Sequence, residues 1–406
     1  MSRLAWLVVG GLVVIAVVLV VLLVSASGTP TVTVPTVPLQ GPPVPSSSTT
    51  PALATAVLAM GQLSDPANTF YELFDRPSGA SGWTLATPPG VADNGGLVVG
   101  PSSNGAVTAG FLPAADLTFS VLATRPAGST QWSAGDAPGT LAAEPDALAT
   151  GPSGQIAAVQ SGTGTPVEAQ APGATSWHRV TTAAELTGAS GGCRVTRISS
   201  IAVTASGVPY VGTRCTGTEV GIFVPDDPSA ASTPGLTAPT GGWARLGPTL
   251  GASGVSATTV LRLQADGGGV TGMVEGSGPG RSSLVGVWSA TGSGIVASSP
   301  LTVPSGWSVR GTATGGAGGT GNQGIAVLLG SSSSSSLRVT GVAGPGRPWV
   351  PYATPPAGTT AVALVGDEVD AFVPSSSTLH VWAANGTGPW HQVAHLTVPI
   401  QYGSSS

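Results

Sequence analysis

A small group of acidic side chains is the first feature of this sequence that suggests chemistry. Charged residues make up only 8% of the chain, so acids that gather in one region are informative. Loops of three successive repeating segments carry six of them: Asp65, Asp93, Asp116, Asp136, Glu144 and Glu185. Grouped carboxylates can bind a cation or accept hydrogen bonds from sugar hydroxyls. The alternative is that they keep the loops soluble and form turns, as Asp93-Asn94-Gly95 would.

Three arginines follow in the next segment of the sequence. Arg194, Arg197 and Arg214 offer guanidinium groups, which capture a carboxylate or phosphate through two parallel hydrogen bonds. With the six acids, they are the candidate ligand-binding residues. The alternative is a structural network in which these arginines pair with Glu185 or Glu219.

The cysteines and histidines predict no metal site. In an exported domain the even pair Cys193 and Cys215 is predicted to form a disulfide, which contributes about 3 kcal/mol through loop closure. No further ligands are spaced around the pair for a metal. His391 and His395 would lie about 13 Å apart on a strand, too far to share one ion. We therefore predict no metal and no cofactor, and we assign no catalytic residue.

An internal repeat supplies the elements that hold these side chains. TFYELFDRPSGASGW at 69–83 and TFSVLATRPAGSTQW at 118–132 share Thr, Phe, Leu, Arg, Pro, Gly and Trp in register. The pattern indicates a strand, a Pro/Gly turn, and a Trp that opens the next strand. Two more strand-like runs complete each unit, so a unit has four strands, a to d. Weaker copies end at Trp177, Trp243, Trp349 and Trp390.

Four strands in a period of about 50 residues are typical of a β-propeller blade. We predict an all-β fold with seven four-stranded blades over residues 54–403. In the fifth blade, strand d would lie at 294–304 without a leading Trp, and Trp307 would begin the following strand a. The first unit lacks strand a, which the tail at 395–403 could supply. The alternatives are six or eight blades, an open stack of sheets, or a pair of β-sandwiches.

On this plan the d–a and b–c connections emerge on one face, and the candidate acids and arginines share it. The Trp after a Gly-containing turn resembles the Asp-box of sialidase-like propellers, Ser-x-Asp-x-Gly-x-Thr-Trp. Here Gly79, Gly128 and Gly173 lie four residues before their Trp rather than three, and no turn carries the Asp. The resemblance covers the architecture of most of residues 54–400. It implies that this face carries the site, but not that the chain has sialidase activity.

The N-terminus predicts where the domain resides. Leu4–Val24 is an unbroken apolar run, long enough to cross a bilayer core of about 30 Å as a helix. Arg3 precedes it, so the positive-inside rule exports the rest of the chain. We predict a transmembrane signal-anchor at 1–24 and a Pro/Thr/Ser-rich linker at 25–53, acting as a stiff stalk or a disordered tether. The alternative is cleavage near Ala26 and secretion.

Composition limits the partners. A net charge of −5 gives no basic patch for nucleic acid. All the basic residues are arginines, which indicates a GC-rich bacterial gene. We expect a membrane-tethered, extracytoplasmic module that recognises or scaffolds a glycan, a cell-wall polymer or a surface protein without catalysis. The alternative is a sialidase-like glycoside hydrolase or lyase that uses loop carboxylates such as Asp93 and Asp116.

Overall fold

The computed structural model describes most of the C-terminal part of the chain. The described residues are 53–61, 69–77, 80–88, 97–102, 104–111, 122–134, 145–160, 166–217, 220–228, 236–248, 250, 255–265, 269–290, 294–315 and 324–398. Contacts divide the chain into two units, Met1–Pro43 and Val44–Ser406, and every described residue belongs to the second. The predicted membrane segment and the predicted linker before Leu53 lie outside these residues. Among the residues described, no helix is long and apolar enough to cross a membrane.

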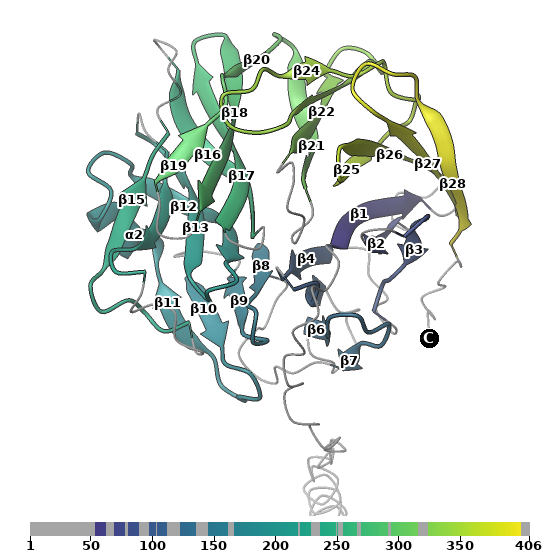
Figure 1. The fold of residues 1–406 in the computed structure, drawn as a ribbon. Helices are drawn as coiled ribbons and strands as arrows, with labels where there is room; N and C mark the ends of the chain where they lie inside the picture. The colour runs from purple at the N-terminus through teal and green to yellow at the C-terminus, as the bar shows by residue number, and fades with distance from the viewer. Residues whose placement is uncertain are drawn as a thin grey trace, which may run out of the picture. The chain divides into compact units, whose positions relative to one another are not determined.

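Antiparallel sheets built from consecutive strands follow one another along the chain (Figure 1). The first sheet has three strands: β1 (Leu53–Gly61), β2 (Thr69–Pro77) and β3 (Thr84–Leu85). The second has four: β4 (Leu97–Pro101), β5 (Val107–Phe111), β6 (Leu122–Arg125) and β7 (Ser133–Ala134). The third also has four: β8 (Ala147–Thr150), β9 (Ile156–Val159), β10 (Val167–Gln170) and β11 (His178–Thr181).

The middle of the chain forms one sheet of nine strands. Its first group is β12 (Val195–Val203), β13 (Pro209–Cys215), β14 (Ile222–Pro225) and β15 (Trp243–Leu246). Its second group is β16 (Ser256–Ala265), β17 (Gly269–Gly278), β18 (Arg281–Ala290), β19 (Ile295–Ala297) and β20 (Leu301–Val303). A single residue pair, Arg214 opposite Thr259, joins the two groups. The nine strands are therefore two consecutive sets whose strand pairing is joined by a single residue pair.

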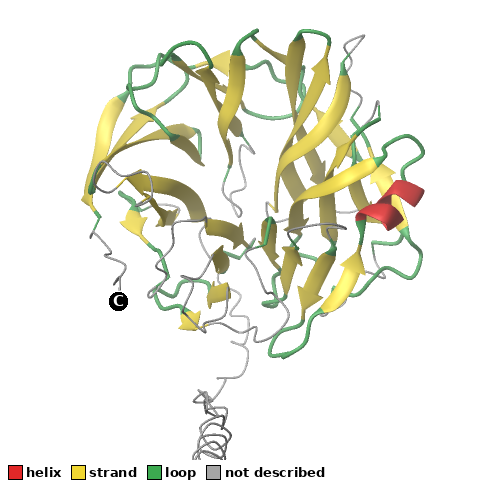
Figure 2. Cartoon of the chain, turned by 180° about the vertical axis from the view of Figure 1, so that it is seen from behind, coloured by secondary structure: helices red, strands yellow, loops and turns green. Residues whose placement is uncertain are grey.

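Two four-stranded sheets complete the described chain. One contains β21 (Trp307–Thr314), β22 (Ile325–Ser331), β23 (Leu337–Val342) and β24 (Val350–Pro351). The other contains β25 (Ala361–Val365), β26 (Glu368–Ser375), β27 (Thr378–Ala384) and β28 (His391–Thr397). The one helix among the described residues is α2 (Ala183–Gly188), which Figure 2 shows in red against strands. The predicted all-β class is confirmed.

The first strands of successive sets are neighbours in space. β1 lies beside β4, β4 beside β8, β8 beside β12 and β12 beside β16. The series continues through β21 and β25, and β25 lies beside β1. Sheets that extend outward from such a closed series of first strands form a propeller-like fold. The propeller-like architecture therefore follows from the strand contacts themselves.

The repeated tryptophans occupy equivalent places in successive sheets. Six of them begin or directly precede an outer strand: Trp83, Trp132, Trp177, Trp243, Trp349 and Trp390. As predicted, the unit without a leading Trp has its outer strands β19 and β20 within 294–304, and Trp307 begins β21. The internal repeat read from the sequence is confirmed.

Several of these tryptophans tie neighbouring sheets together. The indole N–H of Trp132 donates to the carbonyl of Ala86 (2.9 Å), and that of Trp349 to the carbonyl of Ser299 (2.8 Å). The indole of Trp390 likewise donates to the carbonyl of Ala353 (2.8 Å). Each acceptor lies next to an outer strand of the preceding sheet. The repeat thus encodes a link between adjacent outer edges.

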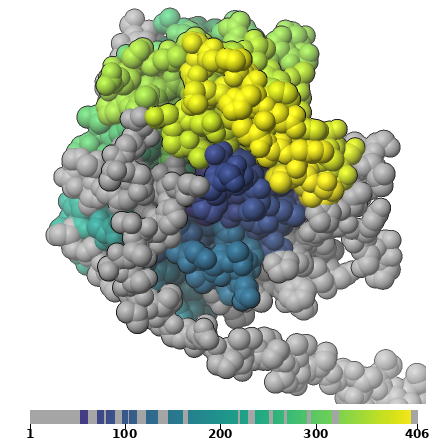
Figure 3. Space-filling view, turned by 45° about the vertical axis from the view of Figure 1, so that its right-hand side comes forward, coloured from purple at the N-terminus to yellow at the C-terminus, as the bar shows by residue number. Residues whose placement is uncertain are grey.

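The apolar core is divided among the interfaces between sheets. Met273 and Trp288 of one sheet pack with Val327 and Leu329 of the next. The same arrangement joins the two ends of the series, where Ala54, Phe74 and Trp83 pack with Phe372, Leu379 and Val398. Figure 3 shows the first sheet in purple directly against the last in yellow. Each sheet therefore buries its faces only with the help of its neighbours.

The C-terminal tail does not have the role expected for its first residues. His391–Thr397 forms β28, which pairs with β27 as the outer strand of the last sheet. The first sheet has β1 as its inner strand and three strands within the described residues. The expectation that the tail supplies the missing first strand is thus wrong for residues 395–397, because they complete their own sheet. Residues 399–403 lie outside the described part of the chain.

Candidate ligand-binding site

A cavity of about 400 Å³ lies among the first strands. β1, β4, β8, β12, β16, β21 and β25 all contribute lining residues. Ligand pockets commonly measure about 300–1,000 Å³ and combine apolar walls with a few polar groups. The polar lining residues here include Thr55, Ser199, Arg262, Gln264 and Thr312. The cavity therefore has the size and the mixed lining of a binding site.

Arg262 is the centre of a hydrogen-bonded network at this cavity. Its Nη1 donates to the carbonyl of Thr312 on β21 (3.0 Å), and its Nη2 donates to Oε1 of Gln264 (3.1 Å). The hydroxyl of Thr314 donates to the same Gln264 oxygen (2.5 Å). Residues 262 and 264 are two apart on β16, so their side chains leave the strand on one face. Burial lowers the pKa of the Arg262 guanidinium from its ordinary value.

Arg262 and Gln264 were not among the residues predicted from the sequence. They interrupt the apolar run VLRLQA within β16. The available signal was the placement of Arg262 and Gln264 at alternate positions, because polar side chains are costly in a fully buried strand unless they have partners. Their roles depend on which face of β16 meets the cavity, and that requires the neighbouring sheets.

Asp146 and Arg197 form an ion pair at the same cavity. The Nη2 of Arg197 lies 2.7 Å from Oδ1 of Asp146, and its Nε donates to Oδ2 (3.2 Å). Asp146 lines the cavity directly before β8, while Arg197 belongs to β12. The pair thus links two neighbouring sheets. Asp146 was not among the predicted acids, although it directly precedes a first strand. The same placement was the reason for choosing four of the predicted acids.

Five of the six predicted acids lie outside the described residues: Asp65, Asp93, Asp116, Asp136 and Glu144. The sixth, Glu185, is exposed and caps helix α2. Its carboxylate accepts the backbone N–H of Thr182 (2.8 Å), and the Thr182 hydroxyl accepts the N–H of Glu185 (3.3 Å). Arg179 lies 4.0 Å from the same carboxylate. This reciprocal capping gives Glu185 a local structural role.

The predicted arginines lie at one end of β12 and β13, and all three are exposed. Arg197 and Arg214 face each other in the strand register, and like charges so placed repel. Acids outside β12 and β13 offset this repulsion. Asp146 holds Arg197, and the charge of Arg214 lowers the pKa of Glu275, which burial raises by more. Arg197 therefore pairs with Asp146 rather than with Glu185.

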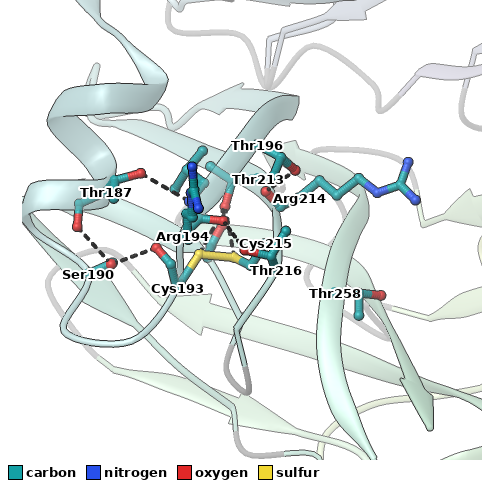
Figure 4. The surroundings of a disulfide bond; sticks show 12 residues. Thr187, Ser190, Cys193, Arg194, Thr196, Thr213, Arg214, Cys215, Thr216 and Thr258 are labelled. Carbon is teal, nitrogen blue, oxygen red and sulfur yellow. Dashed lines mark hydrogen bonds between the residues drawn. A yellow bond between two sulfur atoms is a disulfide. The ribbon is translucent and has the colours of Figure 1, made fainter. Parts of the chain in front are cut away.

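Cys193 and Cys215 form a disulfide, with Cα atoms 5.2 Å apart (Figure 4). The bond connects the segment before β12 to the end of β13, and both cysteines are buried. The hydroxyl of Ser190 donates to the carbonyl of Cys193 (2.6 Å). In Figure 4 the side chain of Arg214 extends away from the sulfur atoms. The disulfide thus fixes the loop that carries Arg194 at the end of these strands.

A second ionisable cluster is buried between the first and last sheets. The Nη1 of Arg76 lies 2.8 Å from Oδ2 of Asp370 and 3.2 Å from Oε1 of Glu368. The indole of Trp83 also donates to Oδ2 of Asp370 (2.6 Å). Asp370 has no exposed surface, and burial raises its pKa to about 6 although Trp83 and Arg76 act in the opposite direction. Because its central carboxylate is fully buried between these sheets, we assign the cluster to their closure.

No metal centre is seen in the described part of the chain: no three of its His, Cys, Asp and Glu side chains are grouped to hold an ion. His380 and His395 stack with ring centroids 4.7 Å apart, on the outer strands β27 and β28. In their sheet these strands lie on the outer side of β26, away from β25, the strand that lines the cavity. The polar side chains that the described residues contribute to the candidate site are hydroxyl, amide, guanidinium and carboxylate groups.

No family model matches the chain, and no curated protein matches it. A putative 6-phosphogluconolactonase from Bacteroides fragilis is 12% identical, over 87% of this chain and 97% of that one, with a TM-score of 0.45. A six-bladed fungal lectin from Aleuria aurantia is 14% identical, over 76% and 96%, at 0.38. The polysaccharide lyase Uly1 is 10% identical, over 86% and 88%, at 0.33. With TM-scores this low, the likenesses carry no argument about function.

Proposed function

We propose that this chain is a membrane-tethered, extracytoplasmic β-propeller that recognises a glycan without turning it over. In this proposal residues 1–24 anchor the chain and residues 25–53 form the stalk. The propeller has seven blades when the nine-stranded sheet is divided at its single joining pair, into β12–β15 and β16–β20. The kinship with sialidase-like propellers is confined to architecture.

The observation that carries the proposal is the cavity among the first strands. Protein partners usually bury about 800 Å² on each side, which needs a broad surface. A cavity of about 400 Å³ walled by strands suits one or two units of a polymer instead. Thr55, Ser199 and Gln264 line it with groups that exchange hydrogen bonds with sugar hydroxyls. A glycan, including a cell-wall polymer, therefore fits better than a surface protein.

The binding proposal is tested with the full-length chain in detergent on arrays of glycans and cell-wall fragments. We expect saturable binding and no released product. Thr360→Trp places a large ring at a cavity-lining position and should abolish binding. Thr354→Trp, a change at an exposed residue of the same connection, should leave it intact. Absence of binding from every array would overturn the proposal, and product release would favour a hydrolase or lyase using loop acids such as Asp93 and Asp116.

Membrane tethering is tested separately in cells. We expect the chain in the membrane fraction and its domain open to protease added outside. Recovery of the domain in the medium, with a new N-terminus near residue 26, would replace the anchor with a cleaved signal peptide. Complete protection from external protease in intact cells, or spheroplasts where an outer membrane is present, would contradict export.

A further inference from the structure

Arg262 differs from Arg76 and Arg125, two other arginines with little exposed surface, in its partners. Arg76 faces the carboxylates of Asp370 and Glu368, and Arg125 forms an ion pair with Asp75. Arg262 donates to two neutral oxygens, the carbonyl of Thr312 and the amide oxygen of Gln264. No ion pair joins it to a carboxylate among the described residues. Within the described part of the chain, its positive charge is thus left uncompensated at the wall of a cavity.

The surroundings of Arg262 hold its guanidinium in place without neutralising it. The amide oxygen of Gln264 accepts from both Arg262 and Thr314, so three side chains fix one another. A guanidinium has five N–H donors, and the two hydrogen bonds to neutral oxygens leave the others for a ligand. A fixed donor set loses less freedom when a ligand binds than a mobile one does.

The charges along the cavity wall favour an anion. Arg310 is a second guanidinium among the lining residues. Asp146 is the one carboxylate among the described lining residues, and Arg197 already holds it through two contacts. The described lining residues therefore carry a net positive charge, in a chain whose net charge is −5. A charge removed from water is costly without a partner, and a bound oxyanion would supply one.

We propose that the cavity is an oxyanion site in which Arg262 binds a carboxylate or phosphate group of the ligand. The inference rests on the proposed function and makes it more specific, because the recognised glycan or wall polymer is then acidic. Gln264 is a positioning residue that orients the guanidinium. Arg262 bridges two blades and contacts the ligand from strand β16, near the propeller axis.

The test compares charged and neutral forms of one ligand on the unmodified protein. Full-length chain is titrated with oligogalacturonate, its full methyl ester, and a glycerol-phosphate oligomer. We expect one or both charged oligomers to bind and the ester to bind about 10- to 100-fold more weakly, the range for losing a charge-assisted hydrogen bond. The two charged probes separate a carboxylate ligand from a phosphate ligand. Binding of the ester as strongly as the acid would overturn the inference while leaving glycan recognition intact.

Substitutions then assign the effect to Arg262. Arg262→Gln should weaken binding of the charged oligomer about 10- to 100-fold and leave the ester nearly unchanged. Arg347→Gln removes an exposed arginine outside the cavity and should bind as the original chain does. Because Arg262 also bridges β16 and β21, circular dichroism checks that each Arg262 variant is folded. Arg262→Lys is a second variant, which keeps the charge with a poorer donor geometry. Unchanged affinity of a folded Arg262→Gln variant for the charged oligomers would overturn the inference. Failure of all three probes to bind would also overturn it. If all three fail while other glycans bind on the arrays, only the acidic ligand class is rejected.

Discussion

At the residue scale, Asp370 links its own protonation to the stability of the closure between the first and last sheets. Its carboxyl is fully buried, and its Oδ1 has no hydrogen-bond partner among the residues that the structure describes. Its folded pKa of about 6 exceeds the ordinary value of 3.8, so folding favours the protonated form. The stability contributed by the protonated form is fully present below about pH 4. It is lost as the pH rises through about 6.

This sign predicts how Asp370→Asn changes the pH dependence of unfolding. The asparagine does not titrate, so the stability of the original chain relative to the variant should fall between pH 4 and pH 7. A shift of about two pKa units corresponds to about 3 kcal/mol. Urea unfolding of both proteins at several pH values measures the difference. A difference that stays constant with pH would show that Asp370 does not titrate in this range.

Trp349 tests the value of one outer link between sheets. Trp349→Phe keeps an aromatic ring but removes the hydrogen bond to Ser299. We expect a loss of about 1 kcal/mol in the free energy of unfolding. Trp307→Phe is the matched control, because Arg338 stacks over that ring (4.5 Å) and its indole N–H has no described acceptor. Equal losses in both variants would show that ring size, and not the link, accounts for the effect.

At the scale of elements, the inner strands come close together because glycine leaves room. A Cβ added to Gly100 on β4 would lie 2.6 Å from the backbone carbon of Leu148 on β8. Gly100→Ala should therefore push these strands apart and cost about 1–3 kcal/mol. Gly247→Ala is the control, since no atom lies within 4 Å of its added Cβ. Thermal unfolding compares the two, and equal midpoints would contradict the close approach.

The disulfide acts on the pair of strands β12 and β13. It closes a sequence separation of 22 residues, and the chain-entropy model gives about 3 kcal/mol for such a loop. The double variant Cys193→Ser, Cys215→Ser should be less stable by about this amount. A reducing agent should lower the unfolding midpoint of the original chain and leave that of the double variant unchanged. Equal midpoints under oxidising conditions would show that the bond adds no stability.

At the scale of the whole molecule, the shared cores predict cooperative unfolding. Each interface between sheets supplies part of the core, and the last interface joins the last sheet to the first. No sheet keeps an apolar core when its neighbours unfold. We therefore expect a single transition in denaturant, with tryptophan fluorescence and far-ultraviolet circular dichroism coinciding. Two separated transitions would mean that part of the series folds independently.

The architecture was readable from the sequence because it repeats. The register of Trp83 with Trp132 survives in the structure, since each marks the start of an outer strand. The site was less readable because its contacts cross between sheets. Arg197 pairs with Asp146, which is remote in sequence, instead of the nearer Glu185. The sequence around position 262 shows that its neighbours are apolar. It does not show which face of the strand meets the cavity.

Ala54 and Val398, near the two ends of the domain, belong to one core. The closed series of sheets could therefore begin at any of its members. A circularly permuted chain could join these two points with a short linker and start between two other sheets. Every interface between neighbours would be retained. Only the sheet at which the domain begins would change.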